Sequence, residues 1–167
     1  IMNFLNNEEF FKRKNFFTDD DNQAFEDNAE RMVFFCKGVM ETVKKFGWPP
    51  DVIHCHGTFT SLIPLFAKKV YHNDPIFRNA KIIYSSYTDL VSSTLNSGFS
   101  KIAAINDLSE KDMAHYFDGK TVDLNKGAMH FSDGLVVGKP ELAAVVKKAS
   151  TGKKMLEYME NGEFLPA

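Results

Sequence analysis

Apolar residues recur every three or four positions over residues 32–46, and this spacing predicts a helix with one continuous apolar face. The apolar positions of this face are Met32, Phe35, Cys36, Val39, Met40, Val43 and Phe46. Asp27 or Asn28 can cap the start of the helix, and Gly47 can end it before the extended turn at 48–50. On this face we expect Cys36 to be a small core residue.

Short apolar runs alternate with helical patterns over most of the remaining chain. The runs at 51–55, 80–87 and 134–138 predict strands, and a last strand is predicted over 155–158. Helices are predicted over 58–72, 123–131 and 140–149, and Pro64 should shift or kink the first turns of the helix over 58–72. This order is typical of βαβ units, so the fold class is α/β with a Rossmann-like parallel sheet flanked by helices. The glycine-bracketed run GLVVG, residues 134–138, is typical of a central strand.

Three segments are less regular. Residues 1–5 predict a short strand, and residues 6–26 predict a long surface loop with short helical turns, whose acidic tract at 19–21 stays solvated. Residues 88–99 predict a loop, and a helix is expected within 108–117, ending at the turn of Asp118 and Gly119.

Length, charge and cysteine content exclude several classes of function. The 167 residues suffice for one domain, and the net charge of −2 argues against nucleic acid as a partner. No apolar run is long enough to span a membrane, and no export signal is recognised. With only Cys36 and Cys55, we expect reduced thiols and a cytoplasmic location.

The stretch DVIHCHGTF, residues 51–59, carries the first candidate chemistry. In a strand, His54 and His56 share one face and Cys55 takes the other. Two histidines at this spacing can bind a transition metal only with a third or fourth ligand. None of the remaining candidates has a ligand spacing: His72, His115, His130 and the acidic tract. We therefore expect no metal site.

The position of this stretch matters more than the histidine pair. Ligands of parallel α/β sheets bind beyond the carboxyl ends of strands, where His56 and Gly57 stand. A glycine there lets a ligand approach the backbone. For His54 we favour a buried, hydrogen-bonded core position, whereas His56 suits a core position or a ligand contact equally well. No Gly-x-Gly-x-x-Gly, phosphate loop or Gly-x-Ser-x-Gly motif occurs.

Residues 25–85 resemble the N-terminal domain of bacterial glycogen and starch synthases, which are retaining glucosyltransferases of the GT-B fold. The resemblance rests on DNAERM at 27–32, WPPDVIHCHGT at 48–58 and the Pro-containing helix that follows. It is similar in detail to short bacterial homologues that carry only this domain, which also share NDPIFRNAKI and FSDGLVVG.

The resemblance implies transfer of glucose from ADP-glucose to an α-1,4-glucan, with the nucleotide-sugar as donor and no bound cofactor. It places His56 at the glucose and Asp27 in the active-site region, both as candidate catalytic residues. It also implies substrate-binding roles for His54, Gly57, Thr58 and Asn28.

The chain departs from the family pattern at several points. Gly57 and Thr58 replace an Asp-Trp pair, the segment YSSY at 84–87 lacks the family's histidine, and neither the Lys-x-Gly-Gly loop nor the C-terminal nucleotide-sugar domain is present. We therefore expect residues 1–167 to form a single, incomplete domain that is inactive on its own. The alternative is a non-catalytic homologue that binds a sugar, a nucleotide or a protein. Because the family's first strands are missing, an open sheet edge is expected, and it suits a homo-oligomer or a separate partner domain.

Overall fold

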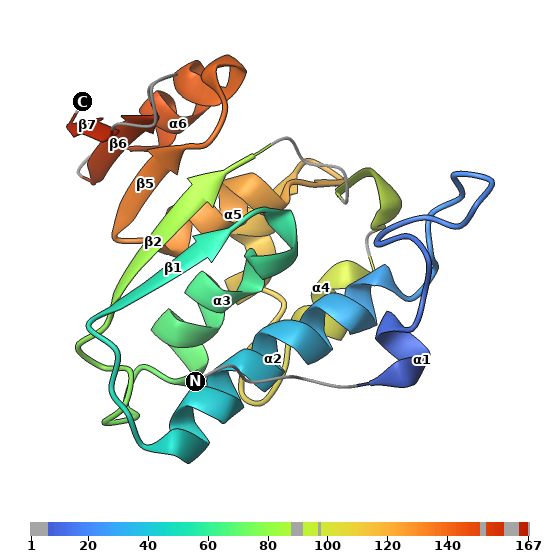
Figure 1. The fold of residues 1–167 in the computed structure, drawn as a ribbon, viewed down its shortest axis with the longest axis horizontal. Coiled ribbons are helices and arrows are strands. Elements are labelled where there is room, and N and C mark those ends of the chain that lie inside the picture. The colour runs from blue at the N-terminus through green and yellow to red at the C-terminus, as the bar shows by residue number, and fades with distance from the viewer. Residues whose placement is uncertain (1–6, 88–91, 97, 151–152, 159–163, 167) are drawn as a thin grey trace.

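One mixed sheet forms the centre of the fold, with the strand order β1-β2-β5-β6-β7 (Figure 1). The computed structural model describes residues 7–87, 92–96, 98–150, 153–158 and 164–166, so the strand predicted over 1–5 lies outside the described residues. The strands of this sheet are β1 (Val52–His56), β2 (Lys81–Ser86), β5 (Gly134–Val137), β6 (Lys154–Tyr158) and β7 (Phe164–Pro166). The first four are parallel and β7 is antiparallel to β6.

The helices and a small hairpin complete the fold. The α-helices are α1 (Glu8–Phe11), α2 (Asn28–Phe46), α3 (Leu62–Leu65), α4 (Phe99–Ala103), α5 (Leu124–Phe131) and α6 (Ala143–Ala149). Short 3-10 helices are η1 (Thr58–Thr60), η3 (Ser92–Thr94), η4 (Asp112–Tyr116) and η5 (Pro140–Leu142), and η2 (Phe66–Val70) is a π-helix. The two-residue strands β3 (Phe117–Asp118) and β4 (Thr121–Val122) pair with each other. None of the described helices combines the length and the apolar character needed to cross a bilayer.

The structure confirms the α/β class and most of the predicted elements. Gly134–Val137 is fully buried between β2 and β6, as expected of a central strand. Gly47 ends α2 with a positive φ of 64°, and the Asp123 side chain caps α5. The predicted helix over 58–72 is divided among η1, α3 and η2, because Pro64 has no N–H to donate within the helical ladder. Helix α4 and strand β7 were not predicted.

Two predictions about α2 are wrong. Phe46 is 58% exposed, because the last turn of α2 extends beyond the helices that cover the sheet (Figure 1). Asp27 occupies the N-cap position, but its side chain makes no capping hydrogen bond, because Arg13 holds its carboxylate. Cys36, by contrast, is fully buried as expected, and its thiol donates to the carbonyl of Phe59.

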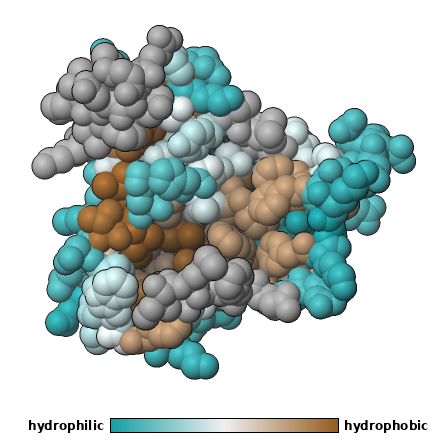
Figure 2. Space-filling model, viewed as in Figure 1, coloured by the Kyte–Doolittle hydropathy of each residue, from teal (hydrophilic) through white to brown (hydrophobic). Residues whose placement is uncertain are grey.

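The two faces of β1 differ in what covers them. Cys55 points into the core beneath α2 and α3 and is 2% exposed. On the opposite face Val52, His54 and His56 are exposed. Figure 2 shows hydrophobic side chains gathered on the visible face over β1 and β2. Strand β1 therefore presents a mixed apolar and imidazole surface at the edge of the described sheet.

Residues 7–26 are more than the surface loop that their composition predicts. Phe11 and Phe17 pack against the core, and an isolated bridge joins Thr18 to Ala24. The segment is folded onto the start of α2 by Arg31, whose guanidinium is buried and bonds to two of its backbone carbonyls.

Candidate functional site

The candidate site begins where β1 ends and turns into η1. Gly57 has φ 75° and ψ 166°, a conformation that is essentially restricted to glycine. Its carbonyl accepts a hydrogen bond from Thr60 Oγ1 at 2.8 Å, which closes the turn. The sequence thus fixes a tight turn at the carboxyl end of β1, directly after His56.

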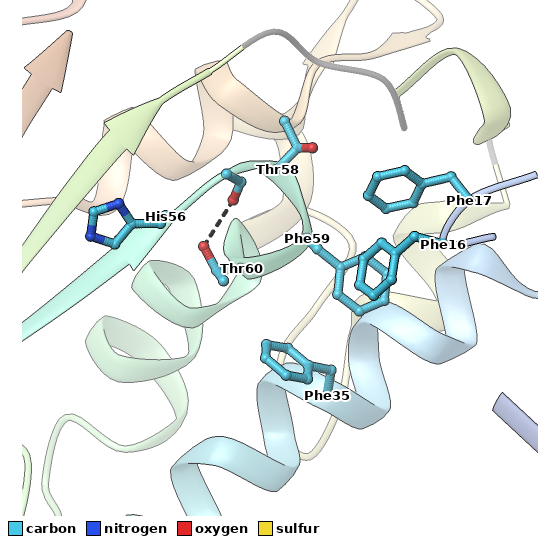
Figure 3. A pocket seen from close by; sticks show the side chains of 8 residues that line it. Phe16, Phe17, Phe35, His56, Thr58, Phe59 and Thr60 are labelled. Atoms are coloured by element: carbon cyan, nitrogen blue, oxygen red, sulfur yellow. Dashed lines mark hydrogen bonds between the residues drawn. The ribbon is translucent and has the colours of Figure 1, made fainter. Parts of the chain in front are cut away.

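A pocket of about 340 Å³ lies over this turn (Figure 3). Its lining combines the turn with four phenyl rings: Phe16, Phe17, Phe35, His56, Gly57, Thr58, Phe59 and Thr60. Figure 3 shows the phenyl rings together at one end of the pocket and His56 at the other. The pocket is therefore aromatic on one side and carries hydroxyl, carbonyl and imidazole groups on the other.

His54 and His56 form a close pair on the exposed face of β1. Their ring centroids are 3.9 Å apart, and His54 Nε2 is hydrogen-bonded to Ser85 Oγ at 2.8 Å. Partial burial of its ring, with a contribution from His56, holds the pKa of His54 below its usual value. The expected core position of His54 is wrong, because no described element covers this face of β1, although the expected hydrogen bond is present.

Asp27 lies at the start of α2 and does not line the pocket. Its carboxylate forms a two-pronged ion pair with Arg13, at 2.8 Å for the Nη1–Oδ1 contact. The hydrogen bond from Arg13 holds the pKa of Asp27 below its ordinary value, so the group stays ionised. Any ligand contact by Asp27 would have to share this carboxylate with Arg13.

Asn28 is completely buried and serves as a connector between segments. Its Nδ2 donates to the carbonyl of Phe17 at 2.9 Å, and its Oδ1 accepts from Arg31 at 2.7 Å. The structure therefore unites His56, Gly57 and Thr58 in one pocket but leaves His54, Asp27 and Asn28 outside its lining. The four phenylalanines of the pocket were not predicted. The Phe-Phe pairs in the sequence were the visible signal for Phe16, Phe17 and Phe35, and Phe59 lies in no such pair.

The charges around the pocket limit what it can hold. Among the described residues that line it, none is a lysine or an arginine. A diphosphate is bound most strongly by cationic side chains, and this lining alone offers a nucleotide-sugar diphosphate none. Within the described residues, no group of three or more histidine, cysteine, aspartate and glutamate side chains is arranged to hold a metal ion.

Comparison with known proteins gives consistent results. Residues 2–161 match the family described as the starch synthase catalytic domain. Glycogen synthase from Chlorobium limicola is 43% identical over 81 residues, which is 48% of this chain and 17% of that protein. Glycogen synthase from Chlorobium phaeovibrioides is 47% identical over 79 residues, covering 47% of this chain and 16% of that protein.

The fold has a solved counterpart. The catalytic domain of starch synthase IV from Arabidopsis thaliana, bound to ADP and acarbose, superposes with a TM-score of 0.67 at 18% identity. The match covers 90% of this chain and 32% of that chain, and at this identity it shows a shared fold. The chain thus spans a minor part of the proteins that it resembles.

Proposed function

Because the chain belongs to the family of starch synthase catalytic domains, we propose that it provides one side of a glucosyltransferase site that transfers glucose from ADP-glucose to an α-1,4-glucan. The observation that carries this proposal is the pocket at the carboxyl end of β1, where His56 meets the turn of Gly57. Ligands of parallel α/β sheets bind at such strand ends.

The residues of the pocket suit a sugar. The His56 imidazole can donate or accept a hydrogen bond with a glucosyl hydroxyl, and Gly57 lets the sugar approach the backbone. Thr58 lies in the same turn and lines the same pocket. We propose that Asp27, Asn28 and His54 position the residues around the pocket. Arg13 keeps Asp27 ionised, and Asn28 connects α2 to the carbonyl of Phe17. The His54 ring packs beside that of His56.

The chain alone is not expected to complete the reaction. The leaving ADP carries a diphosphate, and the pocket lining offers it no cationic side chain. We propose that a nucleotide-sugar domain outside these 167 residues, in the same polypeptide or in a partner, holds the donor. Buried free thiols at Cys36 and Cys55 support a cytoplasmic location.

The test is glucose transfer from labelled ADP-glucose to glycogen by the natural gene product, alone and with candidate partner chains. We expect transfer only when a nucleotide-sugar domain is present, and His56→Ala should lower it by about a hundredfold. His72→Ala is the matched control, since His72 is an exposed histidine outside this pocket. Absence of transfer under every combination would reject the enzymatic proposal.

A second function, sugar binding without catalysis, is favoured by two specific observations. Asp27, a candidate catalytic residue, is committed to Arg13, and Gly57–Thr58 stands where the family pattern has Asp-Trp. A domain of this kind would bind a glucan through the pocket but give no transfer with any partner. Unchanged glucan binding in His56→Ala would exclude the pocket from either function.

We further propose that the free edge of β1 pairs with a strand of another domain or of a second copy of the chain. Lys81 N donates to Asp51 O, and Gly57 N to Ser85 O, so the odd-numbered residues of 51–57 direct their backbone groups to β2. The alternate residues of β1 direct theirs away, and no described strand lies on that side. Light scattering at micromolar concentration tests this proposal. A chain that stays monomeric alone and in mixtures with each candidate partner chain would refute it.

A further inference from the structure

We propose that the phenyl ring of Phe16 is a stacking platform for a glucose ring of a neutral α-glucan, so that this pocket receives the acceptor rather than the nucleotide part of the donor. The inference rests on the proposed function, because it names the substrate class of the same pocket. The inference adds Phe16 and the segment 7–26 to the site, and both lie outside the stretches DNAERM and WPPDVIHCHGT.

Phe16 differs from the other rings of the pocket in its exposure. It is 53% exposed, whereas Phe59 beneath it is 6% exposed and Phe17 and Phe35 are half-buried. Its ring meets Phe17 and Phe59 edge-to-face, with centroids 4.6 and 4.9 Å away. These contacts hold the ring at the mouth of the pocket while leaving much of its surface open to a ligand (Figure 3).

The platform is held in place before any ligand binds. Arg31 is 1% exposed, and its guanidinium donates to the carbonyl of Phe16 at 2.7 Å and to that of Phe10 at 2.8 Å. The same cation lies 5.7 Å from the centroid of the Phe16 ring and 5.9 Å from that of Phe59. A ring fixed in this way loses little conformational entropy on binding, which favours affinity.

The charge of the ligand distinguishes a neutral sugar from a nucleotide as the group that stacks on Phe16. An adenine could stack on Phe16 equally well, but it would bring a diphosphate, and no lysine or arginine lines this pocket to bind it. The two nearby arginines are already occupied: Arg31 bonds to carbonyls and to Asn28, and Arg13 bonds to Asp27. A neutral glucan has apolar ring faces and hydroxyl edges, and these match the phenyl rings, threonines and imidazole of the pocket.

The experiment is calorimetric titration of the 167-residue chain with maltoheptaose, comparing wild type with Phe16→Ala, Phe16→Trp and Phe46→Ala. Phe16→Ala should weaken the affinity for maltoheptaose about tenfold. Phe16→Trp should keep the affinity of wild type, because the larger ring preserves the stacking surface. Phe46→Ala removes an equally exposed phenyl ring at the far end of α2 and should bind like wild type. Circular dichroism melts verify that each variant is folded.

The outcomes separate this inference from the proposed function. If wild type binds maltoheptaose and Phe16→Ala binds within about twofold of it, the stacking role is refuted while the glucan site stands. If wild type binds no glucan, the acceptor platform is refuted, and the proposed function is decided separately by the transfer assay with a nucleotide-sugar domain present. If AMP competes with maltoheptaose and loses its own affinity in Phe16→Ala, the platform takes the nucleobase and the acceptor assignment is wrong.

Discussion

Replacing Arg31 with alanine should release residues 7–26 from the domain and lower its stability by about 3 kcal/mol. The side chain makes three short hydrogen bonds, to the carbonyls of Phe10 and Phe16 and to Asn28 Oδ1. Each hydrogen bond from a charged donor contributes roughly 1.5–3 kcal/mol to stability. The substitution also removes the free-energy cost of burying a cation, and this offsets part of the lost hydrogen-bond energy. Burial is also the main cause that lowers the pKa of Arg31, with the positive charge of Arg13 adding to it.

Urea denaturation followed by circular dichroism gives the free energy of unfolding, and limited trypsin digestion reports on the segment itself. In Arg31→Ala, the bonds at Lys12, Arg13 and Lys14 should be cleaved much faster than in wild type. Arg31→Lys should retain little of the stabilisation that Arg31 contributes, because an ammonium cannot reproduce the planar arrangement of donors of a guanidinium.

Arg13→Ala is the matched control for this prediction. Its ion pair with Asp27 is partly exposed, with side-chain accessibilities of 23% and 31%, and its loss should cost about 1 kcal/mol or less. A loss below about 1 kcal/mol in Arg31→Ala, with unchanged trypsin cleavage, would show that the aromatic contacts hold the segment without the arginine.

Three further changes test other parts of the structure. Gly57→Ala should lower the free energy of unfolding in urea by about 1–3 kcal/mol, because the backbone conformation of Gly57 is essentially restricted to glycine. Gly138→Ala is unsuitable as a control, because its Cβ would lie 2.4 Å from a backbone oxygen. Asp133→Ala should cost roughly 2–4 kcal/mol, since the carboxylate accepts from Lys68 Nζ and from Ile82 N at 2.7 Å, and a cost equal to that of Lys68→Ala alone would contradict the backbone contribution. Burial, with electrostatic contributions from His115 and two lysines, holds the pKa of His130 below its usual value, so the unfolded chain binds the proton of this histidine more readily. The melting temperature should therefore fall as the pH drops from about 7.5 to about 5.5, and an identical fall in His130→Asn would show that this histidine is not responsible.

The elements with strong local patterns were predictable from the sequence. Helix α2 follows from its apolar spacing, and Gly134–Val137 follows from four consecutive apolar or glycine residues between helical segments. The sequence also pointed to the place of the candidate pocket, because ligands of parallel sheets bind at strand ends and His56 with Gly57 marks such an end. These signals lie within a few residues of the features that they predict.

The rest of the site depends on contacts between distant segments, which no local pattern records. Phe16 meets Phe59 across 43 positions of sequence, and whether the open face of β1 is covered depends on elements far from His54. Asp27 has the residue type and position of a helix cap, yet Arg13, which lies 14 residues earlier in the sequence, takes its carboxylate. In each case a long-range partner overrides the local preference.

The same long-range contacts explain how the pocket combines the turn at Gly57 with an aromatic wall formed by Phe16, Phe17, Phe35 and Phe59. The turn from His56 to Thr60 is fixed by the glycine conformation and by hydrogen bonds within the turn and to β2, and none of these involves residues 7–26. Half of the wall depends on that segment, because residues 7–26 supply Phe16 and Phe17, and the carbonyl of Phe16 is bonded to Arg31. The two halves of the pocket should therefore respond separately to mutation: changes at Gly57 alter the polar end, and changes at Arg31 displace the Phe16 and Phe17 part of the aromatic end. A glucan that contacts both ends would lose affinity in either variant, whereas a ligand confined to the imidazole end would be affected only by the first.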